Sequence, residues 1–175
     1  MSRTASAAAC LAALLVSMTS GCGGSNPIAD KQVSTADLNA TKAHVTADSQ
    51  NVANTLGRHG SIFFLKGHWQ GCDDVDYRYL QYVVQGRLDI PVGTGRPVTP
   101  TLVTDLKAAG WSGNYDRGTS NQSTVGLDKG NVGVELAENT SDQMIIFHLT
   151  GPCQKATKAL ADQLLVQQVT DVPHA

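Results

Sequence analysis

The chain has 175 residues, a formal net charge of −2 and 16% charged residues. The length is that of one domain. The lack of a basic excess disfavours nucleic acid as a partner, because phosphate binding needs a basic patch. The chain also lacks a lysine-rich run of the kind that docks proteins to anionic lipid.

An apolar run occupies the N-terminus. Arg3 is its one positive charge, and residues 5–18 contain no charged side chain, which is typical of the n-region and h-region of an export signal. The run is shorter than the about 20 apolar residues of a permanent membrane helix. We therefore expect it to be removed.

Cys22 follows Thr19-Ser20-Gly21. Small residues at the two positions before a cysteine are typical of bacterial lipoprotein signals, which usually have Leu where this chain has Thr19. We expect residues 1–21 to be a lipoprotein signal peptide, with a diacylglyceryl group on the Cys22 thiol. Two or more acyl chains give stable anchoring, so membrane lipid is the first expected partner, at the extracytoplasmic face of the cell membrane. The alternative is an ordinary secretory signal, but no A-x-A-like site precedes the cysteine.

Two cysteines remain for the folded domain. Removal of the signal leaves 154 of the 175 residues with a charge of −3, because Arg3 is the only charged residue lost. Cys10 leaves with the signal and Cys22 carries the lipid, so Cys72 and Cys153 remain in an oxidising compartment. Neither lies in a CxxC motif, so zinc and thioredoxin-type chemistry have no support. We expect a disulfide, worth roughly 4 to 5 kcal/mol in the chain-entropy model; two separate buried thiols are the alternative.

A flexible tether is predicted over residues 22–33, which are rich in Gly, Ser and Asn. A helix is predicted to begin at the capping box Ser34–Asp37 and to end at Gly57. Its apolar stripe has helical spacing and is expected to face the core: Leu38, Val45, Val52 and Leu56. The polar residues placed away from that stripe are Asn39, Lys42, Asp48 and Asn51.

Two strands are predicted next. Residues 60–69 are rich in Ile, Phe and Trp and bounded by glycine, which favours a strand. Residues 70–76 indicate a turn, and residues 77–90 an antiparallel strand with apolar groups on both faces. Residues 91–97 break the pattern with two prolines.

A second helix is expected to begin with Thr99 as N-cap and Pro100 at the first helical position, and to end at Gly110. Hairpins are then predicted, with a weak strand over 112–115, strands over 122–127 and 131–137 around a turn at 128–130, and a strand over 143–150. The strand over 143–150 is the most apolar, so we expect it at the centre of the sheet and buried on both faces.

A last helix is predicted over residues 154–169, and residues 170–175 are expected to be frayed. The order of elements indicates a single α+β domain over residues 34–169. We expect one mostly antiparallel sheet with two or three helices packed on one face, and one disulfide.

One stretch gathers metal-type ligands: His68, Asp73, Asp74 and Asp76. Their spacing does not fit an EF-hand loop. A solvated acidic turn beside a disulfide is therefore the favoured interpretation, and no metal site is predicted.

No catalytic residue is predicted. The chain has no GxSxG, SxxK or HExxH motif, although distant residues can assemble a site without one. His148 lies within an apolar strand, where a satisfied core histidine is commoner than a base. Glu135 and Glu138 are interpreted as edge-strand charges.

The remaining motifs have structural interpretations. Gly93–Arg96 is a lone GxG without the rest of a nucleotide fingerprint, so no cofactor is predicted. Asn121–Ser123 and Asn139–Ser141 are interpreted as turns. The aromatic residues are expected mainly in the core, with a groove for lipid or peptide as the alternative: Phe63, Phe64, Trp69, Tyr77, Tyr79, Tyr82 and Phe147.

Four features occur together in this chain: a cysteine at position 22 after a short signal, a helix, HWQGC at 68–72 and a strand ending in LTGPC at 149–153. In this combination the chain resembles the actinobacterial cell-envelope lipoproteins of the mycobacterial LppA/LppV-like family, over nearly the whole mature chain in architecture. The resemblance implies a membrane-anchored domain with a Cys72–Cys153 disulfide and no assigned enzymatic activity. It carries over no catalytic residue.

Three functions are open to such a chain. The first is a non-enzymatic lipoprotein that binds an unknown envelope protein or small ligand. The second is a carrier of lipid or another hydrophobic ligand, which a closed apolar cavity would favour. The third is an envelope hydrolase, which a cleft with Ser, His and a carboxylate would favour.

Overall fold

The computed structural model describes residues 31–72, 76–91, 98–116, 122–139 and 141–174. The predicted signal peptide, Cys22 and most of the tether lie outside the described residues. Asp73, Asp74 and the segment Gly93–Arg96 lie outside them as well.

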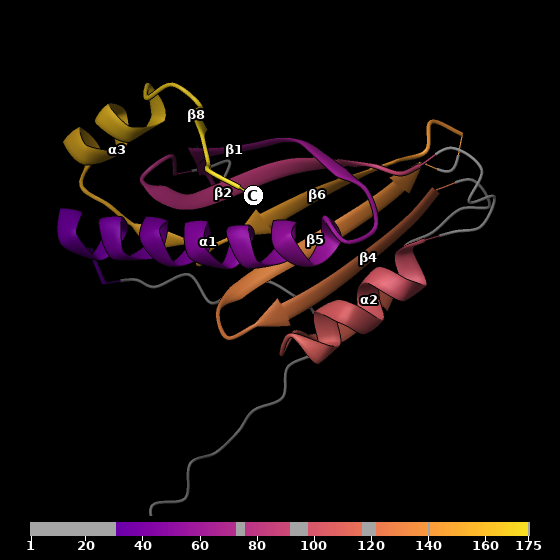
Figure 1. Ribbon diagram of the computed structural model, residues 1–175. Coiled ribbons are helices and arrows are strands. Elements are labelled where there is room, and N and C mark those ends of the chain that lie inside the picture. Colours follow the sequence, from indigo (N-terminus) through magenta and orange to yellow (C-terminus); the bar gives the residue numbers. More distant parts are fainter. Residues whose placement is uncertain (1–30, 73–75, 92–97, 117–121, 140, 175) are drawn as a thin grey trace, which may run out of the picture.

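One antiparallel sheet of eight strands organises the domain, with helices α1 and α2 side by side across it (Figure 1). The elements in chain order are α1 (Thr35–Leu56), β1 (Ser61–Gly71), β2 (Tyr79–Asp89), α2 (Thr99–Ala108), β3 (Ser112–Asp116), β4 (Gln122–Lys129), β5 (Val132–Asn139), β6 (Met144–Thr150), β7 (Gln154–Lys155), α3 (Lys158–Leu165) and β8 (Thr170–Asp171). The strand order is β3-β4-β5-β6-β2-β1-β8, and β7 pairs with β2 beyond the end of β6. The predicted α+β class is confirmed.

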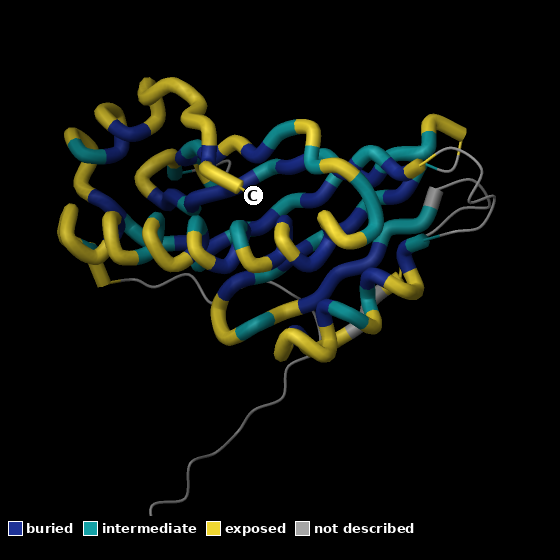
Figure 2. Tube along the Cα trace, viewed as in Figure 1, coloured by how far each residue is buried: buried dark blue, intermediate teal, exposed yellow. Residues whose placement is uncertain are grey.

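Helix α1 begins and ends where the sequence predicts. The Ser34 hydroxyl accepts from the Asp37 amide at 3.2 Å, and the Asp37 carboxylate accepts from the Ser34 amide at 2.9 Å. These two bonds satisfy amides that the first helical turn leaves without partners. The stripe that includes Val45 and Val52 is buried against the sheet, while the outer side of the helix is exposed (Figure 2). The placement of Asp48 on the polar side is wrong, because this carboxylate is 4% exposed.

Two strand glycines make room for large aromatic rings in the core. A Cβ atom on Gly67 would lie 2.2 Å from the Tyr82 hydroxyl oxygen, and one on Gly86 would lie 2.1 Å from Cζ of Phe147. Tyr82 and Phe147 are the largest fully buried side chains of the described residues. The sheet therefore keeps its close packing only with glycine at these two positions.

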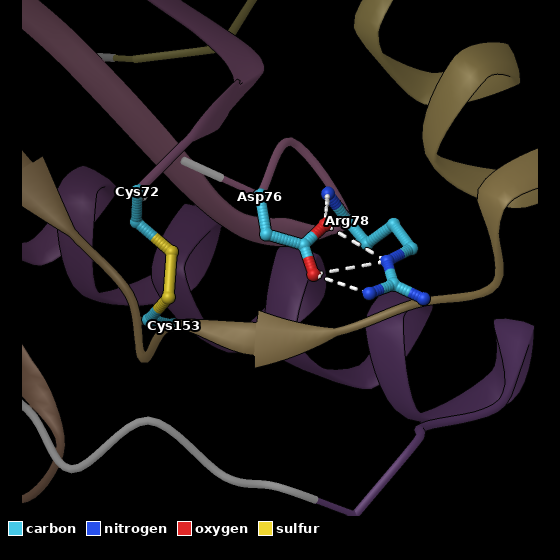
Figure 3. Close-up of a disulfide and its surroundings, with 4 residues drawn as sticks. All are labelled: Cys72, Asp76, Arg78 and Cys153. Atoms are coloured by element: carbon cyan, nitrogen blue, oxygen red, sulfur yellow. Dashed lines mark hydrogen bonds and ion pairs between the residues drawn. A yellow bond between two sulfur atoms is a disulfide. The ribbon is translucent and has the colours of Figure 1, made fainter. Parts of the chain in front are cut away.

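The disulfide joins Cys72, after β1, to Cys153, after β6, with Cα atoms 6.1 Å apart (Figure 3). Strand β2 lies between these two strands in the sheet. The bridge therefore closes the end of a three-stranded unit whose cysteines are 81 residues apart in sequence.

Strand β6 is central, as predicted, but its two faces differ. Ile145, Phe147 and Leu149 are fully buried, whereas Ile146 and His148 are only half-buried. The prediction of burial on both faces is therefore wrong, because the helices cover one face alone.

The C-terminal prediction needs two corrections. The helix spans Lys158–Leu165 rather than residues 154–169, because Gln154 and Lys155 pair with β2 first. The sequence predicts a frayed end over residues 170–175, but β8 pairs with β1. The Val172 amide donates to the Leu65 carbonyl at 2.8 Å, and Val172 is buried. These tertiary hydrogen bonds order a segment that has no strong local pattern.

Candidate functional site

The helices leave one side of the sheet to solvent, and we call this side the open face. Alternation along each strand brings these side chains onto it: Phe64, Lys66 and His68 from β1, Val83, Gln85 and Arg87 from β2, Ile146, His148 and Thr150 from β6, and Glu135 and Ala137 from β5. Most of these side chains are half-buried by their neighbours. The open face is therefore a mixed polar and apolar surface.

A pocket of about 320 Å³ opens on this face at the β1 edge of the sheet. Its lining consists of Phe64, Lys66, His68, Gln85 and Val169. Lys66 is directly opposite Gln85 in the β1–β2 pairing, and Val169 comes immediately before β8. Three polar side chains therefore converge between two apolar ones.

Lys66 differs from the other cations that the described strands carry. Arg87 pairs with Asp89 at 2.6 Å and lies over the Phe63 ring, while Lys129 pairs with Asp48 at 3.1 Å. Among the described residues, Lys66 has neither an ion pair nor a ring contact, even though Asp171 is opposite it in β8. Lys66 therefore brings to the pocket an ammonium charge that no described residue pairs in a direct contact.

His148 lies in the same cross-strand row as Lys66 and Gln85, next to Glu135 of β5. Burial lowers the pKa of His148, the Glu135 carboxylate partly opposes that shift, and His68 adds to it. The imidazole is therefore mainly neutral at pH 7. The sequence predicts that His148 is a histidine of the core. That prediction is wrong, because the His148 ring lies half-buried on the open face.

Glu138 has a structural role that the sequence interpretation missed. Strand β5 lies between β4 and β6, so neither Glu135 nor Glu138 is an edge charge. Glu138 is 2% exposed and accepts hydrogen bonds from the Val98 amide at 2.9 Å, the Thr99 amide at 3.0 Å and the Thr99 hydroxyl at 2.6 Å. A carboxylate at a helix N-terminus satisfies free amides and the helix dipole. Val98, not Thr99, is accordingly the N-cap of α2.

Asp48 is the second buried carboxylate under the helices. It accepts from Lys129 at 3.1 Å, and its other oxygen lies 3.2 Å from Nε2 of His44. The Lys129 ammonium also lies over the Trp111 ring, 5.8 Å from its centre. These contacts tie α1 to β4, so Asp48 serves the fold.

The predicted crowd of metal-type ligands does not come together in the described residues. His68 faces the pocket, and Asp76 is bound by Arg78, whose Nε donates at 2.8 Å (Figure 3). The Arg78 hydrogen bonds lower the pKa of Asp76 to about 2. Nowhere in the described ranges do three or more His, Cys, Asp or Glu side chains form a metal-binding group.

The aromatic residues belong mainly to the core, as expected. Trp69, Tyr79, Tyr82 and Phe147 are buried, and Trp69 packs edge-on against Tyr82 at 5.2 Å between ring centres. Phe63 and Tyr77 are exposed. No described histidine is hydrogen-bonded to a serine or a cysteine, so no Ser–His or Cys–His pair is assembled among the described residues.

Sequence reasoning missed Lys66, Gln85 and Val169 as pocket residues. The available signal was the period of two along residues 64–68, which sets Phe64, Lys66 and His68 on one face of a strand. Val169 carried no such signal, because it reaches the pocket only through the pairing of β8 with β1.

The described part of the chain has no helix long and apolar enough to span a membrane. No family model matches the chain, and no curated protein matches it. Among solved structures the chain is similar to LppA from Mycobacterium tuberculosis, a provisionally assigned lipoprotein, with a TM-score of 0.40 and 11% identity over 75% of this chain and 82% of LppA. Likeness at that level assigns neither family nor function to this chain, so the LppA/LppV-like resemblance stays a prediction.

Proposed function

We propose that this chain is an envelope lipoprotein whose domain is held at the extracytoplasmic face of the membrane by lipid on Cys22. The observation that carries the proposal is the disulfide between Cys72 and Cys153. Structural disulfides persist in oxidising compartments and are rare in the cytosol. Of the three cysteines that follow the signal, two are therefore used by the fold, and Cys22 is left for the anchor.

The start of the domain suits a tethered arrangement. The Val33 amide donates to the Lys155 carbonyl at 2.8 Å, and the Val33 side chain packs against the core. The fold therefore holds the chain from Val33 onward. The eleven residues from Cys22 to Gln32 can span at most about 40 Å when extended. A tether of that length keeps the domain near the membrane surface.

The open face gives this domain a surface for recognition, and we infer a binding or accessory role rather than catalysis. Lys66, His68 and Gln85 point into one pocket and make no hydrogen bond with another described residue. Convergent polar groups among apolar ones are typical of small-ligand sites. The carrier function is less well supported, because four of the aromatic side chains that would line a lipid cavity are buried in the core.

The anchor is tested by Cys22→Ser in the producing cell, with Cys10→Ser as the matched control. We expect wild type and Cys10→Ser in the membrane fraction, because Cys10 leaves with the signal peptide. We expect Cys22→Ser to lose the acyl mass on its N-terminal peptide and to leave that fraction. An unmodified Cys22 thiol in the wild-type protein would contradict the proposal.

A further inference from the structure

We propose that the pocket on the open face binds a small carboxylate that carries an apolar group. This inference deepens the proposed binding role and rests on it. The carboxylate is held by Lys66, His68 and Gln85, and the apolar group packs between Phe64 and Val169. The pocket volume of about 320 Å³ is at the lower end for small-molecule sites.

The backbone fixes the polar groups relative to one another. Lys66 and His68 are two residues apart on one strand, so their Cα atoms are about 7 Å apart and their side chains point the same way. Gln85 is directly opposite Lys66, which places the two Cβ atoms roughly 5 Å apart. An ammonium, an imidazole and an amide therefore surround one small volume and can all donate to a carboxylate.

The local charges favour an anion at this position. The Lys66 ammonium has no ion pair with a described residue, and a charge-assisted hydrogen bond is about twice as strong as a neutral one. Two carboxylates oppose the anion. Asp171 is the cross-strand neighbour of Lys66, and Glu135 lies three strands from β1, roughly 14 Å away. Asp171 therefore limits the affinity, and its removal should increase it.

The two apolar side chains of the pocket, Phe64 and Val169, favour a ligand that has an apolar group beside its charge. Phe64 is half-buried on β1, and Val169 is 55% exposed on the segment before β8. An exposed valine beside a half-buried phenylalanine loses water contact when an apolar group lies between them. Inorganic phosphate has no such group, so it should bind more weakly than an aromatic carboxylate.

The test is a titration of the full-length mature chain with phenylacetate, with its neutral analogue phenylacetamide and with inorganic phosphate. Saturation-transfer NMR detects binding of the two organic ligands, and competition against phenylacetate detects binding of phosphate. The protein is measured in phosphatidylcholine nanodiscs if it carries lipid, with empty nanodiscs as the blank, and in buffer if it does not. Loss of the anchor therefore leaves the binding measurement intact. We expect phenylacetate to bind with a Kd on the order of 1 mM, as small fragments do, and phenylacetamide about tenfold more weakly.

Three variants locate the ligand. Lys66→Gln should weaken phenylacetate binding about tenfold and leave phenylacetamide unchanged. Asp171→Asn should strengthen phenylacetate binding by a few fold. Val169→Ser, at an exposed position, should weaken phenylacetate and leave phosphate unchanged. Lys107→Gln, an exposed lysine of α2 away from the pocket, is the matched control and should change nothing.

Thermal melts that match wild type establish that each variant is folded. Absence of saturable phenylacetate binding by the folded wild-type protein would overturn the proposal. Equal binding of phenylacetate and phenylacetamide, or an equal loss in Lys66→Gln and Lys107→Gln, would also overturn it. Tighter binding of phosphate than of phenylacetate would contradict the role of the two apolar side chains.

Discussion

Both sides of the sheet carry charged residues, but the two sides use them differently. Under the helices, the carboxylates Asp48 and Glu138 are buried and bound by Lys129 and by the α2 N-terminus. On the open face, Lys66 and His68 line a pocket and have no hydrogen-bond or ion-pair partner among the described residues. A buried charge is costly unless it is paired, whereas a charge beside solvent is not. The covered face therefore supports the fold, and the open face is free for recognition.

The largest effect expected from the contrast between the covered face and the open face is at Gly86, on the covered side of β2. Gly86→Ala would place a Cβ atom 2.1 Å from the Phe147 ring. We expect it to lower the free energy of unfolding by about 3 kcal/mol, the upper end of the usual cost of overpacking a core. Gly71→Ala, at the end of β1, is the control, because its nearest neighbour would be 4.0 Å away. Urea denaturation measures both. Equal stabilities would contradict the close packing of the covered face.

Glu138→Gln tests the comparison within a single strand. The change should lower the free energy of unfolding by about 2 kcal/mol, the usual worth of a hydrogen bond to a charged group. It removes the carboxylate that accepts from Val98 and Thr99, and urea denaturation measures the loss. Glu135→Gln, three residues away on the open face, should change the free energy of unfolding at pH 7 by less than about 0.5 kcal/mol. A smaller loss in Glu138→Gln than in Glu135→Gln would reverse the assignment of the two faces.

The elements of the fold could be predicted where their signals are local. The capping box at Ser34 and the turn signal around Gly130 each lie within a few residues of what they determine, and α1 and the β4–β5 hairpin form there. The disulfide could be predicted as well, because the lipoprotein pattern left two cysteines to pair.

The predictions failed where the partner is distant in sequence. Helical spacing places Asp48 on the polar side of α1 and gives no sign of its partner Lys129, which is 81 residues away. The local pattern favours an edge charge at Glu138, because the amides it binds at the start of α2 are about 40 residues earlier. The pocket was missed for the same reason, because Val169 joins it only through the pairing of β8 with β1.

His148 gives the finest test, since it is half-buried at the centre of the open face. In the folded protein the pKa of His148 is lowered, mainly by burial. Once the pH falls to about 6.5, the usual histidine pKa, His148 is therefore protonated more in the unfolded chain than in the folded protein. Stability that is present above this pH is then lost as the pH drops through the folded pKa. His148→Gln should therefore lose less stability than wild type between pH 7 and pH 5, as measured by the urea midpoint.

The neighbours of His148 supply opposite tests of the same pKa, which NMR titration of the ring proton measures directly. The Glu135 carboxylate raises this pKa and His68 lowers it. Glu135→Gln should therefore lower the His148 pKa further, and His68→Gln should raise it. If neither change moves the pKa, the ring does not share an electrostatic environment with the pocket. The polar centre of the open face would then be independent of the site at its edge, and the two could be altered separately.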